Sequence, residues 1–194
     1  MQKNQHFLNE IGLIDNFLTP EECVKIINYK DNKNIVSDFS KGKIGTEKIN
    51  IKVRESNIGF IVSNYYTEWL YKKVYKLSQI LSEDLDIELD YVEQLQLAEY
   101  SKDYQGYYHR HVDIGGVVNS RHRKISATIQ LSDPNDYEGG ELLIYSLHGS
   151  ESMTAPKEIG SLTFFSSVVL HEVTKVTKGI RYSLVIWFSG PKFR

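Results

Sequence analysis

The stretch YYHRHVD, residues 107–113, places two histidines and an aspartate within reach of one another. His109 and His111 are two apart, as are His111 and Asp113, and residues two apart in a β-strand point to the same side. If the stretch is a strand, imidazole and carboxylate groups can face one metal ion. The H-x-D pattern is weak by itself, and a polar strand on a wet surface is the alternative interpretation.

A second stretch, residues 164–188, supplies what such a site would further need. It predicts His171 at a strand end, then a turn at residues 178–179. Arg181 and Ser183 follow on one face of the next strand. Two imidazole nitrogens and one carboxylate form the facial triad of non-haem Fe(II) oxygenases, which leaves coordination positions open. An α-keto acid that chelates the metal has a far carboxylate, for which Arg181 offers a planar fork of donors.

The composition excludes several classes of protein. With 194 residues the chain is long enough for one sizeable core and too short for two independent domains. A formal net charge of −2 gives no broad attraction to nucleic acids or acidic membranes. Cys23 is the single cysteine, which excludes an intrachain disulfide. The sequence contains no secretory signal and no apolar run of about 20 residues, so we expect a soluble, cytoplasmic protein.

Two helices are predicted in the first half of the chain. Thr19 is typical of a helix N-cap, with Pro20 at the first helical position and Glu22 completing a capping box. A second, amphipathic helix is predicted from about Ile58 to Leu81, because apolar residues recur there at steps of three and four.

The remaining segments predict strands. Residues 7–18 are interpreted as a short strand and turn, residues 31–50 as a loop with one strand, and residues 49–56 as a strand. After residue 86, short strands are separated by Gly, Asp, Pro and Asn, with a tight glycine turn at residues 139–140. The predicted layout is helices first, followed by a β-sandwich that packs on them.

Five blocks occur in the order of one known family: GLIDNFLTPEECVKII (12–27), KVRESNIGFI (52–61), LAEYSKDYQGYYHRHVD (97–113), RKISATIQLSDPNDYEGGEL (123–142) and GSLTFFSSVVLHEVTKVTKGIRYSLVIWF (160–188). Together they resemble the Fe(II)/2-oxoglutarate-dependent dioxygenases of the prolyl 4-hydroxylase-like branch. The resemblance implies an α+β, mainly β fold with a double-stranded β-helix (jelly-roll, cupin-like) core packed against N-terminal helices. It implies one domain over residues 1–194, with helical support mainly at 19–85 and the jelly-roll core mainly at 87–190.

Position by position, the resemblance implies a catalytic metal site. The implied iron ligands are His111, Asp113 and His171. His111 rather than His109 is then the ligand within YYHRHVD.

The resemblance places the co-substrate 2-oxoglutarate beside Arg181. Arg181 is expected to pair with its distal carboxylate, with Ser183 and Tyr100 as helpers. Tyr108 is expected to line the pocket near the metal. Trp187 is expected to line the back of the co-substrate pocket.

Further expectations concern other polar residues. Tyr100 lies about two residues farther from the metal histidine than the family pattern has it, so Tyr104 is the alternative helper. Arg54 and Ser56 are expected to serve structure, and residues 121–124 to form a solvated charged loop. Three weaker candidates for pocket lining share one strand face: Ser126, Thr128 and Gln130.

The activity that the resemblance implies is hydroxylation of an aliphatic C–H bond, favouring a prolyl residue of a peptide or protein, with release of succinate and CO2. It requires Fe(II), 2-oxoglutarate and O2, with ascorbate as a stimulating reductant. A free amino acid or other small-molecule substrate, a non-catalytic cupin-like metal-binding module and an idle scaffold are the alternatives. No nucleic acid or membrane partner is expected, since Trp187 stands where nucleic-acid demethylases tend to carry a second arginine. The oligomeric state stays open.

Overall fold

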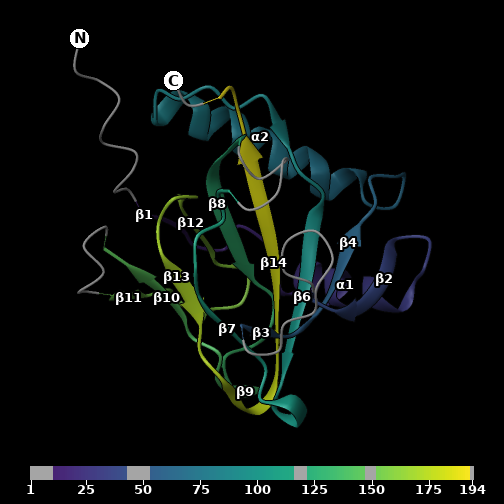
Figure 1. The fold of residues 1–194 in the computed structure, drawn as a ribbon. Coiled ribbons are helices and arrows are strands. Elements are labelled where there is room, and N and C mark those ends of the chain that lie inside the picture. Colours follow the sequence, from purple (N-terminus) through teal and green to yellow (C-terminus); the bar gives the residue numbers. More distant parts are fainter. Residues whose placement is uncertain (1–10, 43–52, 116–121, 147–151, 193–194) are drawn as a thin grey trace.

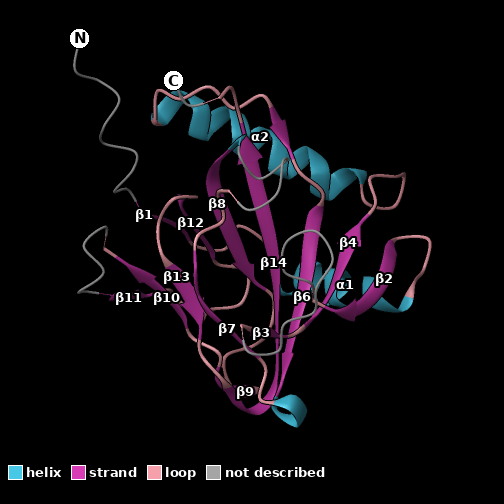
Figure 2. Cartoon of the chain, in the orientation of Figure 1, coloured by secondary structure: helices cyan, strands magenta, loops and turns pink. Residues whose placement is uncertain are grey.

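The computed structural model describes residues 11–42, 53–115, 122–146 and 152–192. Two antiparallel sheets form its body, and two α-helices lie behind the larger one in the view of Figures 1 and 2. The larger sheet runs in the order β1 (Ile11–Ile14), β12 (Leu162–Ser166), β8 (Arg123–Gln130), β14 (Val176–Ser189), β6 (Leu95–Ser101), β4 (Asn57–Ile61) and β2 (Val36–Lys41), with β5 (Tyr91–Val92) and β9 (Tyr137–Gly139) also paired to β14. The smaller sheet runs in the order β11 (Ser152–Thr154), β10 (Leu142–Tyr145), β13 (His171–Val173), β7 (Tyr107–His111) and β3 (Arg54–Glu55).

Most of the buried apolar residues fall into two clusters, one on each face of the larger sheet. Leu97, Ile129 and Leu184 belong to the cluster that also contains the buried residues of the helices. The neighbouring residues Ala98 and Tyr100 belong to the second cluster, which includes residues of the smaller sheet. Because strand side chains alternate, one face of the larger sheet packs on helices and the other faces the smaller sheet. This mainly β, jelly-roll arrangement with supporting helices confirms the expected fold class.

The first helix begins as the sequence predicts. α1 spans Pro20–Asn28, and the Glu22 amide donates to the Thr19 hydroxyl at 3.3 Å. In return the Thr19 amide donates to the Glu22 carboxylate at 3.0 Å. Both halves of the capping box are therefore present, and they satisfy backbone donors that the helix leaves free. A short 3-10 turn, Tyr29–Asp31, follows the helix.

The second helix begins ten residues later than predicted. α2 spans Glu68–Asp84, whereas β4 occupies Asn57–Ile61 and pairs with β2 and β6. Between the two, the Thr67 hydroxyl donates to the Val62 carbonyl at 2.6 Å and reverses the chain. β2, β3 and β4 lie between α1 and α2, and β2 falls within residues 31–50, where one strand is predicted. The apolar residues near Ile58 are compatible with a strand, and the pairing of this segment with β2 and β6 favours the strand over the predicted helix.

The last long strand runs through a predicted turn. β14 is continuous from Val176 to Ser189, so the turn expected at residues 178–179 is wrong. Gly179 instead has φ +66°, and a Cβ atom there would lie 1.9 Å from the Asp136 carbonyl oxygen. Just before it, the register with β9 shifts between Val176 and Lys178, which marks a bulge. Arg181 and Ser183 still share one strand face beyond it.

Two further expectations can be compared with the structure. Gly139 and Gly140 both have positive φ, of +76° and +64°, as the predicted tight turn requires. Residues 7–10 and 49–52, which belong to predicted strands, lie outside the described residues. Within the described part of the chain, no helix has both the length and the apolar character needed to span a membrane.

Candidate metal centre

Two strands that are distant in sequence bring the predicted ligands together. β7 and β13 pair antiparallel, with His111 directly opposite His171, and Asp113 follows two residues after the end of β7. The Asp113 amide donates to the Ser167 carbonyl at 3.0 Å, which fixes the chain at this point. One potential ligand atom from each of His111, Asp113 and His171 lies within 4.8 Å of the other two.

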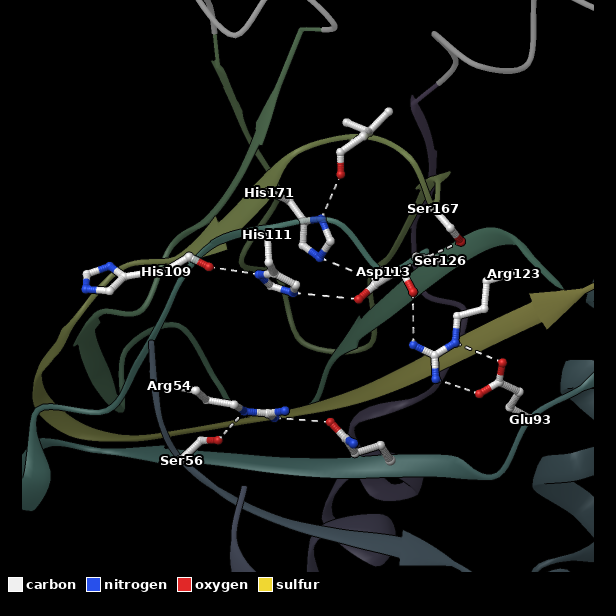
Figure 3. A network of polar contacts seen from close by, with 12 residues as sticks. Arg54, Ser56, Glu93, His109, His111, Asp113, Arg123, Ser126, Ser167 and His171 are labelled. Carbon is white, nitrogen blue, oxygen red and sulfur yellow. Dashed lines mark hydrogen bonds and ion pairs between the residues drawn. The ribbon is translucent and has the colours of Figure 1, made fainter. Parts of the chain in front are cut away.

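Backbone carbonyls orient both imidazoles. The Nδ1 atom of His111 lies 2.8 Å from the His109 carbonyl oxygen, and Nδ1 of His171 lies 2.9 Å from the Val169 carbonyl oxygen. Since a carbonyl only accepts, each Nδ1 carries the proton and each Nε2 has a free lone pair. Both Nε2 atoms point toward Asp113, at 3.6 Å and 3.5 Å from its carboxylate oxygens (Figure 3). The lone pairs of two imidazoles and the carboxylate thus converge.

The Asp113 carboxylate is itself held in place. The Ser126 hydroxyl donates to its Oδ2 at 2.6 Å, and the Ser167 hydroxyl lies 2.9 Å from that of Ser126. Arg123 donates to the Asp113 carbonyl at 3.2 Å. The Arg123 guanidinium also donates to both carboxylate oxygens of Glu93, at 2.8 and 2.6 Å, in a fork-to-fork pair. With the carboxylate held in this way, its Oδ1 faces His111 and its Oδ2 faces His171.

The electrostatics favour the protonation states that a metal needs. Burial, and after it the neighbouring His171, lowers the pKa of His111 well below its usual range, so this imidazole is neutral at neutral pH. Burial alone would raise the pKa of Asp113, but His171 and His111 lower it below its ordinary value, and its carboxyl group is ionised. Neutral imidazole and ionised carboxylate are the forms that bind metal ions.

His109 takes no part in this cluster. Its side chain is exposed and points away from the other two histidines (Figure 3). Its ring contacts that of Tyr107, with centroids 4.6 Å apart. The sequence prediction that His111 rather than His109 belongs to the site agrees with this geometry, while iron binding itself stays a prediction.

The three residues line a pocket of about 480 Å³, together with Arg181, Ser183, Tyr108, Trp187, Thr128, Arg54, Gln96 and Arg123 among others. Arg181 is 3% exposed, and its guanidinium donates to the Ser183 hydroxyl at 3.4 Å. Gly140 makes room for it, because a Cβ atom there would lie 2.9 Å from the Arg181 Cδ atom. Arg181 is therefore a buried cation that lines the pocket.

Neither of the two expected helper tyrosines, Tyr100 and Tyr104, lines the main pocket. Tyr100 does not line the pocket, but its ring lies 5.5 Å from the Arg181 guanidinium carbon. The Tyr104 hydroxyl donates to the Glu99 carbonyl at 3.1 Å, and Tyr104 does not line the pocket either. Tyr137, which the sequence analysis missed, shares a smaller cavity with Arg181 and accepts a hydrogen bond from Gln130 at 2.7 Å.

The three weaker candidates for pocket lining also have different positions. Thr128 lines the main pocket and Gln130 only the smaller cavity. Ser126 binds Asp113 and lines neither.

Two arginines have larger roles than the sequence analysis gave them. Arg123, expected in a solvated charged loop at residues 121–124, lies in β8 with a side chain only 15% exposed, and its guanidinium carbon is 3.8 Å from the Trp187 ring centroid. Residue 121 of that segment lies outside the described residues. Arg54, expected to serve structure, lines the pocket. No local sequence signal marks either role, since both depend on strand pairing.

Known proteins resemble the chain in sequence and in fold. Residues 95–189 match the model of the 2OG-Fe(II) oxygenase superfamily. A PKHD-type hydroxylase of Parvibaculum lavamentivorans is 39% identical over 87 residues, which are 42% of this chain and 38% of the relative. Another from Teredinibacter turnerae is 41% identical over 89 residues, or 44% of this chain and 38% of the relative. The chain thus matches well under half the length of these curated relatives.

The fold comparison covers more of the chain. A Pseudomonas putida prolyl-4-hydroxylase superposes with a TM-score of 0.72 at 18% identity, covering 93% of this chain and 92% of that one. A Trichoplax adhaerens prolyl hydroxylase, solved in complex with a hypoxia inducible factor peptide fragment, gives 0.78 at 20% identity, covering 96% and 86%. Residues 95–189 thus resemble the 2OG-Fe(II) oxygenase superfamily in sequence, and the fold of the chain is that of the prolyl hydroxylases.

Proposed function

We propose that this chain uses Fe(II), 2-oxoglutarate and O2 to hydroxylate an aliphatic C–H bond, with succinate and CO2 as the other products. A prolyl residue of a peptide or protein is the favoured substrate. The observation that carries the proposal is the convergence of His111, Asp113 and His171, with ligand atoms within 4.8 Å, in the pocket that also contains Arg181. We further propose that residues 1–194 act as one domain.

The donor set suits Fe(II). Two imidazole nitrogens and one carboxylate are the ligands of non-haem Fe(II) oxygenases, which keep the remaining coordination positions free. His111 and His171 would bind through Nε2, since their Nδ1 atoms face carbonyl oxygens. The Ser126 hydroxyl would hold one oxygen of Asp113 and leave the other for the metal. Bound iron would supply the activation of dioxygen by electron transfer, and the residues would supply its orientation.

The cation at Arg181 suits the distal carboxylate of 2-oxoglutarate. Arg181 is buried, and its guanidinium contacts two neutral groups, the Ser183 hydroxyl at 3.4 Å and the Tyr137 side chain. A planar guanidinium binds a carboxylate through two parallel hydrogen bonds. Tyr108 and Trp187 would exclude water from the pocket that they line, and Tyr100 would position Arg181 from the adjacent strand.

Support for the substrate comes from relatives. Several matched proteins are named PKHD-type hydroxylases, and one structure of similar fold was solved with a peptide bound. A free amino acid or other small molecule remains the alternative substrate. Stimulation by ascorbate remains an expectation of the resemblance.

The proposal can be tested in two steps. Under anaerobic conditions, adding 2-oxoglutarate to the protein with Fe(II) should produce a visible charge-transfer absorption band, and absence of both the band and of 2-oxoglutarate binding would overturn the co-substrate assignment. A screen of prolyl peptides, amino acids and other small molecules, analysed by mass spectrometry, should then reveal a gain of one oxygen with matching succinate. Conversion of amino acids without conversion of any prolyl peptide would favour the alternative substrate.

A further inference from the structure

Arg54 is a buried cation of the pocket that lacks a carboxylate partner among the described residues. It lies on β3 of the smaller sheet, is 6% exposed and lines the same pocket as the metal cluster. Burying a guanidinium away from water costs free energy unless hydrogen bonds and an opposite charge compensate for it. The contacts of Arg54 therefore indicate what the pocket is built to receive.

Among the described residues, the Arg54 side chain donates hydrogen bonds to two neutral groups. Its Nε donates to the Ser56 hydroxyl at 2.6 Å, and its Nη2 donates to the Gln96 amide oxygen at 3.1 Å (Figure 3). A guanidinium has five N–H donors, so these two contacts fix its plane and leave donors available. Gln96 matters here, because a carboxylate at this position would neutralise Arg54 within the protein. The amide orients Arg54 and preserves its charge.

The other cations of the pocket have assigned partners. Lys41 and Arg123 each pair with a glutamate. Arg181 has the position proposed for the distal carboxylate of 2-oxoglutarate. Asp38 also lines the pocket, but it is exposed and forms no ion pair with Arg54 in the described part of the chain. Arg54 is thus the pocket cation whose charge is left for a ligand.

One aromatic ring connects Arg54 with the metal centre. The Arg54 guanidinium carbon lies 4.6 Å from the centroid of the Tyr108 ring. The same ring stacks on His111, with centroids 3.5 Å apart and planes 14° from parallel. A single ring thus separates Arg54 from a histidine of the metal centre, and both line the same pocket.

We propose that Arg54 binds a carboxylate of the primary substrate and so selects substrates that carry this group close to the carbon to be hydroxylated. This inference rests on the proposed oxygenase function and narrows its substrate class to carboxylates, such as a free amino acid or a peptide with a C-terminal or side-chain carboxylate near the target. Arg181 and Arg54 would then hold two different acids, the co-substrate and the substrate, on either side of the reaction.

The first test measures anion binding directly and requires no turnover. The full chain, with ¹⁵N-labelled arginine, is loaded with Zn(II) and saturating 2-oxoglutarate, and the Arg54 Nε–H signal is assigned by its loss in Arg54→Lys. Acetate should shift this signal saturably, whereas acetamide, of the same shape but uncharged, should not. Absence of a saturable shift, or equal shifts with both probes, would overturn the proposal. Because the readout is the Arg54 signal, a failure of 2-oxoglutarate binding would be seen separately.

A nearly isosteric variant supplies the matched control. Gln96→Glu places a carboxylate beside Arg54 without changing the size of the side chain, and it should weaken acetate binding about tenfold or more. 2-Oxoglutarate binding through Arg181, measured on the same samples, should change less than about twofold because the variant leaves that contact in place. Unchanged acetate affinity in Gln96→Glu would contradict the proposal.

Turnover provides the second test. For any substrate found in the oxygen-gain screen, the free acid should react about tenfold or more faster than its carboxamide with the unaltered protein. Arg54→Gln and Gln96→Glu should each remove this preference. Equal rates for acid and amide with the unaltered protein would overturn the proposal while leaving the oxygenase function in place.

Discussion

The two faces of the larger sheet use the same strands for different purposes. Along β14, Leu184, Ile186 and Phe188 are fully buried in the apolar cluster that includes the helices. Arg181 and Ser183 alternate with this row along the strand and face the other way. They are almost as deeply buried, at 3% and 1% exposure, but they are polar and line the pocket. Burial of these side chains therefore stabilises the fold on the helix-covered face and costs stability on the pocket face.

This difference shows how the fold supports the site. Apolar burial stabilises by about 25 cal/mol per Å² of area removed from water, whereas buried polar groups cost stability unless they are hydrogen-bonded. The stability gained by apolar burial on the helix-covered face thus offsets the stability lost by burying polar groups on the pocket face. Substitutions on the two faces should separate stability from ligand binding, and the following predictions test that separation.

The largest effect is expected at the metal centre. His171→Ala removes one of three ligands, and Fe(II) binding and succinate production should be lost by more than about 100-fold, since changes in outer contacts alone cost 10–100-fold. Anaerobic Fe(II) titration with the 2-oxoglutarate absorption band measures this. His109→Ala, an exposed neighbour, is the matched control and should retain binding. The ligand assignment would be wrong if His109→Ala abolished binding and His111→Ala preserved it.

On the opposite face, stability should change instead. Leu184 is fully buried against the helices, so Leu184→Ala should lower the free energy of unfolding by about 2–5 kcal/mol. Urea unfolding measures the loss, and the folded fraction should still bind Fe(II) and 2-oxoglutarate normally. The adjacent variant Ser183→Ala should cost about 1 kcal/mol or less but weaken 2-oxoglutarate binding. Similar losses of stability in both variants would remove the distinction between the faces.

The sequence predicts best what depends on neighbouring residues. The capping box of α1 involves Thr19 and Glu22, three residues apart, and it is present in the structure. His111 and Asp113 are likewise only two residues apart, and they lie in one cluster in the structure. By contrast, the segment near Ile58 carries an apolar pattern that fits a helix or a strand, and only its pairing with β2 and β6 decides for a strand.

Functional positions that depend on distant pairing escape sequence reasoning. Arg54 enters the pocket because β3 pairs with β7, and its partner Gln96 comes 42 residues later. The predicted turn before Arg181 is part of a continuous strand, with a bulge between Val176 and Lys178 that depends on pairing with the distant strand β9. The family resemblance supplied the candidate ligands, but only the three-dimensional structure indicates which other side chains hold them.

A smaller effect is expected from a conservative change at the co-substrate position. Arg181→Lys keeps the positive charge but loses the planar fork that suits a carboxylate. 2-Oxoglutarate affinity, measured by calorimetry with Mn(II) in place of Fe(II), should fall about 10–100-fold, because a charged pair of parallel hydrogen bonds is lost. Metal affinity without 2-oxoglutarate should stay unchanged. A full retention of 2-oxoglutarate affinity would contradict the role proposed for Arg181.

The smallest effect concerns a residue that touches the metal centre only through Asp113. The Ser126 hydroxyl donates to the Oδ2 atom of this carboxylate at 2.6 Å and so fixes its orientation beside the two histidines. Ser126→Ala should weaken Fe(II) binding about tenfold, the lower end of the range for contacts that orient a ligand. Ser167→Ala is the matched control, since the Ser167 hydroxyl contacts that of Ser126 at 2.9 Å, whereas Ser126 is the serine that donates to the Asp113 carboxylate. Its effect should be smaller, because Ser126 can still donate to Asp113. Equal effects of the two variants would mean that the serine pair acts through packing, and that orientation of Asp113 on the pocket face does not depend on a single hydrogen bond.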